Sequence, residues 1–167
     1  TLVLGLMGSG GSAPGVQLYD LQTGYGNGKL IGGLPSNSIN GFAATTDVLY
    51  IATNGGIGRW NYAASDWMNP LTTSDGLPTN VVEDVLVEGN YLWMTTTAGL
   101  VRMNLTTNAT TLYTSASGLM GTSTMSLTSY TPTGGETTLF IGHDGAGSER
   151  PAVTTIGLTS GTITGHE

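Results

Sequence analysis

Short apolar clusters recur along the chain, and each is followed by a glycine-rich turn. The clusters are Leu2–Gly5, Leu49–Ala52, Leu92–Thr95 and Leu139–Gly142, and their first residues lie 47, 43 and 47 positions apart. Consecutive bulky, β-prone residues are typical of a strand that is buried on both faces. No window of useful length places apolar residues three or four apart, as an amphipathic helix would require. A repeat of about 40–45 residues is typical of the blades of a propeller.

A second recurring element, Gly-Leu followed by Pro in two of its three copies, separates the repeat units. It begins at Gly33, Gly76 and Gly118 and precedes the next apolar cluster by 16, 16 and 21 residues. The longer third spacing is explained by residues 130–137, which are rich in the Pro, Gly and Thr of turns. Residues 2–16 also align without gaps with residues 139–153, so the first and fourth units share a long loop.

Each unit is predicted to hold four antiparallel strands, as a propeller blade does. The first strand follows the Gly-Leu element, the second is the apolar cluster, the third follows the glycine-rich turn, and the fourth precedes the next Gly-Leu. The expected ranges are 38–45, 81–88 and 124–130 for the first strand, 16–21, 57–62, 100–105 and 153–158 for the third, and 29–31, 67–72 and 110–114 for the fourth.

The fold class predicted from this pattern is all-β, a β-propeller with about four blades in this chain. The repeat units are expected at residues 1–32 (incomplete), 33–75, 76–117 and 118–167. The first unit lacks its first strand, and the last ends on a short segment at 162–167. Three arrangements fit these ends: a closed four-bladed ring, a part of a six- to eight-bladed ring, or a blade completed by a neighbouring subunit.

The amino-acid composition excludes several classes of binding partner and site. Charged residues make up 9% of the chain and hydrophobic residues 38%, which favours a folded β domain over disorder. The net charge of −7 arises because Lys29, Arg59, Arg102 and Arg150 are the only basic residues, too few to form a patch for nucleic acid or an anionic membrane. The absence of cysteine excludes disulfides and thiolate metal sites.

The ends and the sequons bear on location. No run of 18 apolar residues is present, so no membrane insertion is expected, and the start at Thr1 lacks the pattern of an intact signal peptide. We therefore expect a processed or partial chain. Two glycosylation sequons begin at Asn104 and Asn108 and mildly favour an extracellular or cell-surface location.

The repeat resembles the two-component-regulator propeller repeat, in which Gly-Leu-Pro-x-Asn is followed by Leu-Trp-Ile-Gly-Thr-x-x-Gly-Leu-x-Arg. The third unit matches this pattern through Gly76, Leu77, Pro78, Asn80, Val82, Leu92, Trp93, Thr96, Gly99, Leu100, Arg102 and Asn104. The second unit matches through Gly33, Leu34, Pro35, Asn37, Ile39, Leu49, Ile51, Thr53, Gly56, Arg59 and Asn61. The resemblance implies a propeller fold and either an extracytoplasmic sensing domain of a hybrid kinase or a secreted or surface protein. Fold alone does not choose between them.

Residues 143–150 form the most chemically mixed segment, with His143, Asp144, Glu149 and Arg150. One loop supplies neither the converging ligands of a metal site nor a complete catalytic triad. An ordinary solvated loop is the preferred interpretation, but a ligand, if there is one, is expected here. The run Gly8–Gly15 lacks the following Lys and helix of a phosphate cradle. Adjacent Glu83 and Asp84 point to opposite faces of a strand and are not a catalytic pair.

Two sets of repeat-equivalent residues have both a structural and a binding interpretation. Tyr50, Trp93 and Phe140 occupy one position inside the apolar clusters, where a core between blades is preferred over a carbohydrate-stacking surface. Arg59 and Arg102 are also equivalent, and we expect them to hold strands together through hydrogen bonds and not to bind an anion.

The leading hypothesis is a non-enzymatic extracellular or cell-surface scaffold or interaction module without catalytic residues, cofactor or metal. Its expected partners are proteins or copies of itself through open blade edges, or carbohydrate. The alternative is a ligand-sensing propeller of a membrane receptor, and the third candidate is a propeller lyase or hydrolase. An enzyme would need converging acid, base or metal ligands, and His143 and His166 are the only imidazoles.

Overall fold

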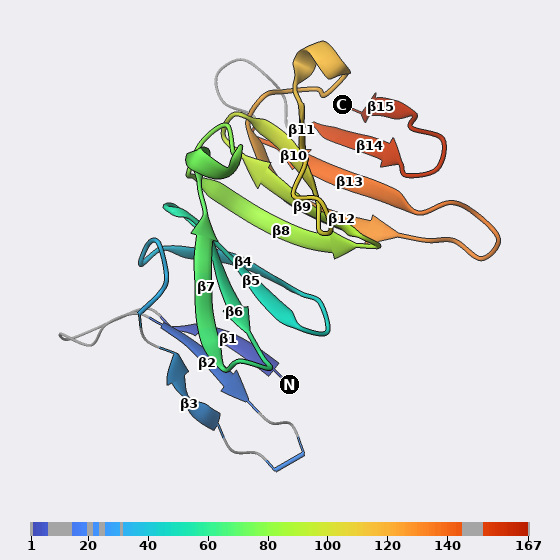
Figure 1. Cartoon of the computed structure of the whole chain (residues 1–167). Helices are drawn as coiled ribbons and strands as arrows, with labels where there is room; N and C mark the ends of the chain where they lie inside the picture. The colour runs from blue at the N-terminus through green and yellow to red at the C-terminus, as the bar shows by residue number, and fades with distance from the viewer. Residues whose placement is uncertain are drawn as a thin grey trace.

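The computed structural model describes residues 2–6, 15–19, 22–23, 26–30, 32–144 and 152–166. These residues form four antiparallel sheets, one of three strands followed by three of four strands (Figure 1). Within every sheet the strand order follows the sequence. Two 3₁₀ turns, η1 (Thr73–Asp75) and η2 (Ser115–Ser117), are the helical elements of this part of the chain.

The strands fall where the repeat predicted them, and the all-β propeller prediction is confirmed. The first sheet holds β1 (Leu2–Leu6), β2 (Gly15–Tyr19) and β3 (Gly26–Leu30), and the second holds β4 (Ile39–Ala44), β5 (Val48–Thr53), β6 (Gly56–Asn61) and β7 (Asp66–Leu71). The third holds β8 (Val82–Glu88), β9 (Tyr91–Thr96), β10 (Gly99–Asn104) and β11 (Thr110–Tyr113). The fourth holds β12 (Thr124–Tyr130), β13 (Thr138–His143), β14 (Val153–Gly157) and β15 (Ile163–His166).

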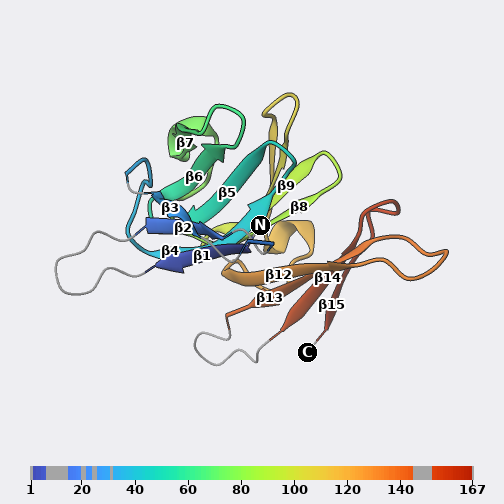
Figure 2. The same ribbon diagram turned by 90° about the horizontal axis from the view of Figure 1, so that it is seen from below.

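The sheets radiate from their first strands, as Figure 2 shows from below. Hydrogen bonds join these inner strands across the blades. Asn40 Nδ2 donates to the carbonyl of Val82 at 2.7 Å, and the amide of Leu127 donates to Asp84 Oδ2 at 3.1 Å. The inner strands β4, β8 and β12 share a register shift at their second residue, a β-bulge that repeats from blade to blade. The structure is therefore a repeat in its hydrogen bonding as well as in its sequence.

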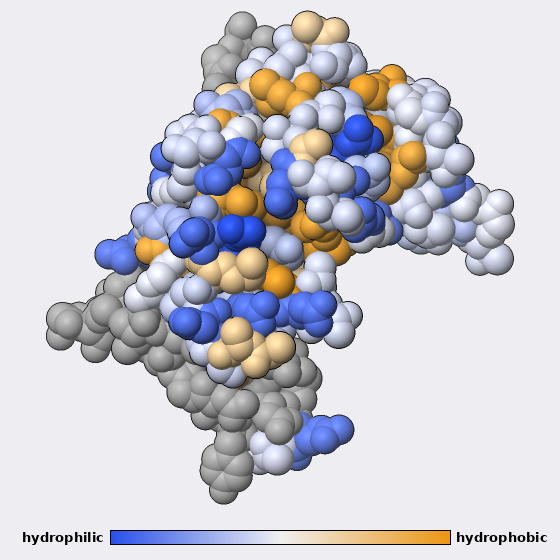
Figure 3. All heavy atoms as spheres, viewed as in Figure 1, coloured by the Kyte–Doolittle hydropathy of each residue, from blue (hydrophilic) through white to orange (hydrophobic). Residues whose placement is uncertain are grey.

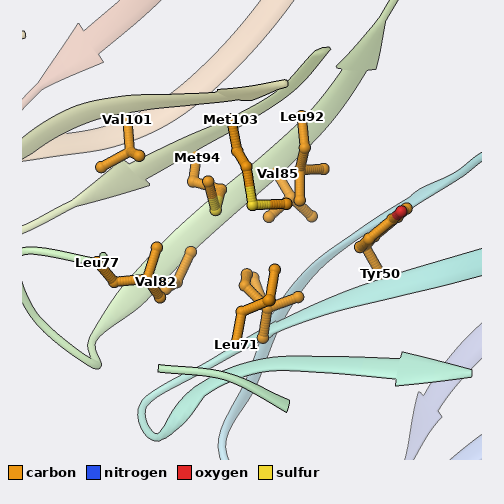
Figure 4. Close-up of a cluster of buried hydrophobic side chains, with 11 residues drawn as sticks. Tyr50, Leu71, Leu77, Val82, Val85, Leu92, Met94, Val101 and Met103 are labelled. Carbon is orange, nitrogen blue, oxygen red and sulfur yellow. The ribbon is translucent and has the colours of Figure 1, made fainter. Parts of the chain in front are cut away.

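The core lies between neighbouring sheets, because alternate side chains of a strand point to opposite faces of its sheet, toward the sheet that covers each face where there is one. Figure 4 shows the cluster between β4–β7 and β8–β11, to which Tyr50 and Leu71 contribute from one sheet and Leu92 and Met94 from the other. A second cluster joins β8–β11 to β12–β15, and a third joins β1–β3 to β4–β7. Burial on both faces explains why the apolar clusters of the sequence are continuous and do not alternate.

The Gly-Leu element connects consecutive blades and packs between them. Gly76 and Gly118 follow the two 3₁₀ turns with φ of 95° and 100°, a left-handed conformation that favours glycine. The leucines after them, Leu77 and Leu119, are 5% and 4% exposed and belong to the clusters between sheets. The recurring dipeptide thus turns the chain from one blade to the next and fills the seam that it crosses.

The tight turns between the second and third strands are held by buried threonines. Thr53 Oγ1 donates to the carbonyl of Gly56 at 2.8 Å, and Thr96 Oγ1 donates to that of Gly99 at 2.7 Å. Thr124 of the next blade adds a further link, because its hydroxyl accepts from the amide of Thr96 at 2.9 Å. Thr53 and Thr96 thus stabilise their own turns, and Thr124 couples the third blade to the fourth.

The four sheets follow one another along an open arc, with β1–β3 at one end and β12–β15 at the other (Figure 1). Among the described residues, no further sheet packs on the face of β12–β15 that points away from β8–β11. The visible surface is dominated by pale residues of intermediate hydropathy with strongly hydrophilic residues in small groups (Figure 3).

Candidate functional site

The predicted ligand loop is described at its first two residues, and these do not converge. His143 ends β13 and is 8% exposed, whereas Asp144 is exposed and its amide donates to the carbonyl of Ser123 at 3.3 Å. The other two residues of the predicted site, Glu149 and Arg150, lie outside the described residues. The described part of the loop therefore offers a buried imidazole and a separate surface carboxylate.

The imidazole of His143 lies beneath the Gly-Leu-Met turn of its own blade. Nε2 is 2.7 Å from the hydroxyl of Thr154, which also accepts from the amide of Met120 at 3.0 Å. Nδ1 is buried without a hydrogen-bond partner. Burial lowers the pKa of His143 below 6.5, and the nearby backbone of Ser123 and Gly121 raises this pKa to a smaller extent. The arrangement favours a neutral histidine that supports the turn.

The role of His143 has a counterpart in the repeat. It occupies the position of Thr53 and Thr96, the last residue of the second strand in each unit. In those units the threonine closes a tight turn, whereas in the fourth unit a longer connection follows. The equivalence of His143 with Thr53 and Thr96 can be found in the sequence, since each of the three residues directly follows an aligned apolar cluster.

The aromatic set divides into two buried residues and one exposed residue. Tyr50 and Trp93 are 7% and 2% exposed in the clusters between sheets, so the core prediction is confirmed for both. For Phe140 it is wrong, because this side chain is 37% exposed. The reason is its place in the arc: Phe140 stands on the outer face of β12–β15, where no described sheet follows.

The two equivalent arginines make different contacts, and both hold their own blade. Arg59 donates through Nε to the carbonyl of Asn69 at 2.8 Å, and its terminal nitrogen also donates to that oxygen. A register shift between β6 and β7 accompanies this contact, and β10 and β11 pair without one. The guanidinium of Arg102 instead lies 4.9 Å from the ring centroid of Tyr91 and within 6 Å of those of Trp93 and Tyr113. Hydrogen bonds fix the first arginine, as predicted, and aromatic rings fix the second.

Carboxylates also serve strands and turns. Asp84 accepts from the amides of Val85 at 2.9 Å and Leu127 at 3.1 Å, so it joins two blades. Glu136 accepts from the amides of Thr159 and Ser160, both at 2.9 Å, and the Ser160 backbone contact is the main cause of its lowered pKa. Within the described ranges, no three His, Cys, Asp or Glu side chains gather closely enough to bind a metal ion.

The asparagine side chains of the two sequons differ in how they are held by the protein. The side-chain oxygen of Asn104 accepts from the amides of Thr106 and Thr107 at 2.9 and 3.0 Å, which ties this side chain into the turn after β10. Asn108 is exposed in the same turn with φ of 58°. Asn108 therefore presents its side chain better than Asn104 does. The same described residues contain no helix long and apolar enough to cross a membrane.

Comparison with known proteins shows likeness of fold. No protein-family model and no curated protein sequence matches the chain. The extracellular domain of a hybrid two component system from B. thetaiotaomicron superposes with a TM-score of 0.63 at 15% identity, over 90% of this chain and 20% of that one. The extracellular domain of a one component system from the same organism gives 0.68 at 16% identity, over 94% and 20%.

A chain of a nidogen–laminin complex gives a TM-score of 0.63 at 11% identity, over 98% of this chain and 60% of that one. The present 167-residue chain spans about a fifth of the length of each of the two bacterial domains. Likeness at this identity extends to the fold and no further.

Proposed function

We propose that this chain is a non-enzymatic interaction module of an extracellular β-propeller and contributes to a larger assembly. One observation carries the proposal: the described residues whose side chains could act as an acid or a base instead make hydrogen bonds that hold the blades and turns together. His143 supports a turn through Thr154, and Asp84 joins two blades through Leu127. Such residues are fixed by their structural partners, whereas a catalytic acid or base needs a cleft that a substrate can reach.

The extracellular location rests on two kinds of support. The bacterial structures with this fold are extracellular domains. Asn108 also presents a sequon at the exposed end of its blade. A surface of low charge, rich in Thr and Ser, suits contacts with proteins or carbohydrates and disfavours nucleic acid.

The experiment is a binding survey of the purified 167-residue chain. Sedimentation velocity measures self-association, and a glycan array together with pull-down of defined extracellular matrix proteins measures binding to other macromolecules. We expect the folded chain to bind at least one of these without turnover of a bound glycan. A folded chain that associates with neither itself nor any probe would contradict the proposal, and so would hydrolysis or elimination of a glycan.

A second function, ligand sensing by a membrane receptor, is favoured by the two bacterial neighbours, which belong to one- and two-component systems. In that case the gene would also encode a transmembrane segment and a kinase or DNA-binding domain. Sequencing the complete gene separates the two functions, because a scaffold requires neither element.

A further inference from the structure

The outer face of β12–β15 is an ordered sheet surface with exposed apolar side chains. Phe140 lies between Thr128 and Thr155 in the pairing register, and Tyr130 pairs with Thr138. Phe140, Val153 and Tyr130 are 37%, 40% and 63% exposed. Their neighbours Leu139, Ile141 and Ile156 point to the opposite face, where they pack against β8–β11.

The same positions on the two preceding sheets form interfaces. Tyr50 and Trp93 are the repeat equivalents of Phe140, and each is buried by the sheet that follows. Leu100 is the equivalent of Val153 and is fully buried. The outer face of β12–β15 thus continues a series of sheet-to-sheet interfaces, which indicates another sheet of the same type as its occupant.

The other end of the arc offers such a sheet. The first sheet has three strands, and β1 pairs with β2 on one side only within the described residues. In sequence, Leu2 and Leu4 hold the positions of Leu139 and Ile141, which face the preceding sheet in the fourth blade. By this alignment, one face of β1–β3 corresponds to the face with which each later sheet packs against the sheet before it.

Charge also suits a sheet as the occupant. The residues that line the outer face in register are Ser126, Thr128, Tyr130, Thr138, Phe140, Gly142, Val153, Thr155, Gly157, Thr164 and His166. No carboxylate, Lys or Arg is among them. The carboxylate of Glu136 lies over Gly157 at one end of this face, where the amides of Thr159 and Ser160 donate to it. The rest of the face can be covered without burying an unpaired ion.

We propose that the outer face of β12–β15 docks on the β1–β3 sheet of a second copy of this chain, so that blades stack head to tail between copies. This inference rests on the proposed function and names its partner. The interface is heterologous, so it either closes into a ring or continues as a filament. Four strands about 4.8 Å apart and about five residues long cover roughly 300 Å² of plane sheet. A stable interface buries about 800 Å² per partner. A single contact is therefore weak, and association should depend on concentration.

The test is sedimentation velocity of the full chain from micromolar to near-millimolar concentration, with Phe140→Lys as the variant. Leu112→Lys is the matched control, because Leu112 is 44% exposed on β11 outside the proposed interface. We expect the original chain and the control to associate, more strongly at higher salt because each copy carries a net charge of −7. Phe140→Lys should weaken association roughly tenfold or more, because the lysine would be desolvated without a partner.

A mixing experiment tests the head-to-tail geometry. Phe140→Lys still offers its β1–β3 sheet, so adding it to the original chain should cap growing assemblies and lower their mean mass. Circular dichroism and thermal melting establish that each variant is folded. If Phe140→Lys does not fold, Thr128→Lys replaces it, because Thr128 is exposed in the same cross-strand row.

Two results would overturn the inference. One is a folded chain that stays monomeric at every concentration, and the other is association of Phe140→Lys as strong as that of the original chain. A monomeric chain that binds a glycan or matrix protein would refute this interface and leave the proposed function standing. Failure of all binding would refute both.

Discussion

Trp93 and Phe140 provide a stability experiment in which one repeat position is tested in a buried and in an exposed setting. Replacing a core Trp or Phe by Ala costs about 3–5 kcal/mol. Trp93 is 2% exposed, but its Nε1 is buried without a hydrogen-bond partner. Removing an unpaired donor offsets part of the loss, by about 1 kcal/mol. We therefore expect Trp93→Ala to lower the free energy of unfolding by about 3 kcal/mol.

Phe140→Ala should cost about 1 kcal/mol, because the ring is partly solvated and its loss leaves no closed cavity. Trp93→Phe separates the two effects at the buried site, since it keeps a ring and removes the unpaired N–H, and about 1.5 kcal/mol or less is expected. Urea denaturation followed by circular dichroism gives these values, provided the slope with urea is unchanged. Low protein concentration keeps self-association from adding to stability. A loss below about 1 kcal/mol for Trp93→Ala, or equal losses at the two positions, would refute the reasoning.

Three other substitutions test the links between blades, the buried histidine and the sequons. Thr124→Val should cost about 1–3 kcal/mol, because the buried amide of Thr96 loses its acceptor, with Thr128→Val as an exposed control measured by the same urea assay. Burial lowers the folded pKa of His143 below 6.5, so the unfolded chain binds the proton more readily. Stability should then be constant above pH 6.5 and fall as pH decreases from there through the folded pKa. Urea titrations above and below pH 6.5 measure this decrease in the free energy of unfolding. His143→Thr should remove the decrease, whereas His166→Gln should keep it. When the chain is secreted from a glycosylating host, Asn108→Gln should abolish the glycan mass shift and Asn104→Gln should not, because the Asn104 side chain is held by its turn.

The blade architecture could be predicted from sequence because several local signals agree at each repeat. The continuous apolar clusters mark strands covered on both faces, and the Gly-Leu elements mark the seams where Leu77 and Leu119 are buried. The exposure of Phe140 could not be predicted in this way. A sequence pattern identifies the position on a blade, but the neighbour that covers it is a property of the whole arc.

The candidate site was harder to predict than the fold for a related reason. His143 stands beside Asp144 in the sequence, yet its imidazole is buried at the end of β13 with a hydrogen bond to Thr154, whereas Asp144 follows the strand and is exposed. The contact of Arg102 with Tyr91 likewise depends on the register of β9 and β10. Residue type predicts an ordinary solvated loop or a ligand loop at residues 143–150, and of these residues the structure shows His143 as the support of a turn.

The order of strands within each sheet has a consequence for how the molecule opens. Within each sheet the strands pair with those next to them in sequence, so each sheet can form from local hairpins before it meets another sheet. Arrays of this kind behave as coupled units in a line, with stability shared between nearest neighbours. Among the residues that the structure describes, the sheet β8–β11 is covered on both faces, whereas β12–β15 is covered on one. Native-state hydrogen exchange should therefore be slowest at Met94 and Val101 and faster in β14 and β15, so that the arc frays from its last blade inward.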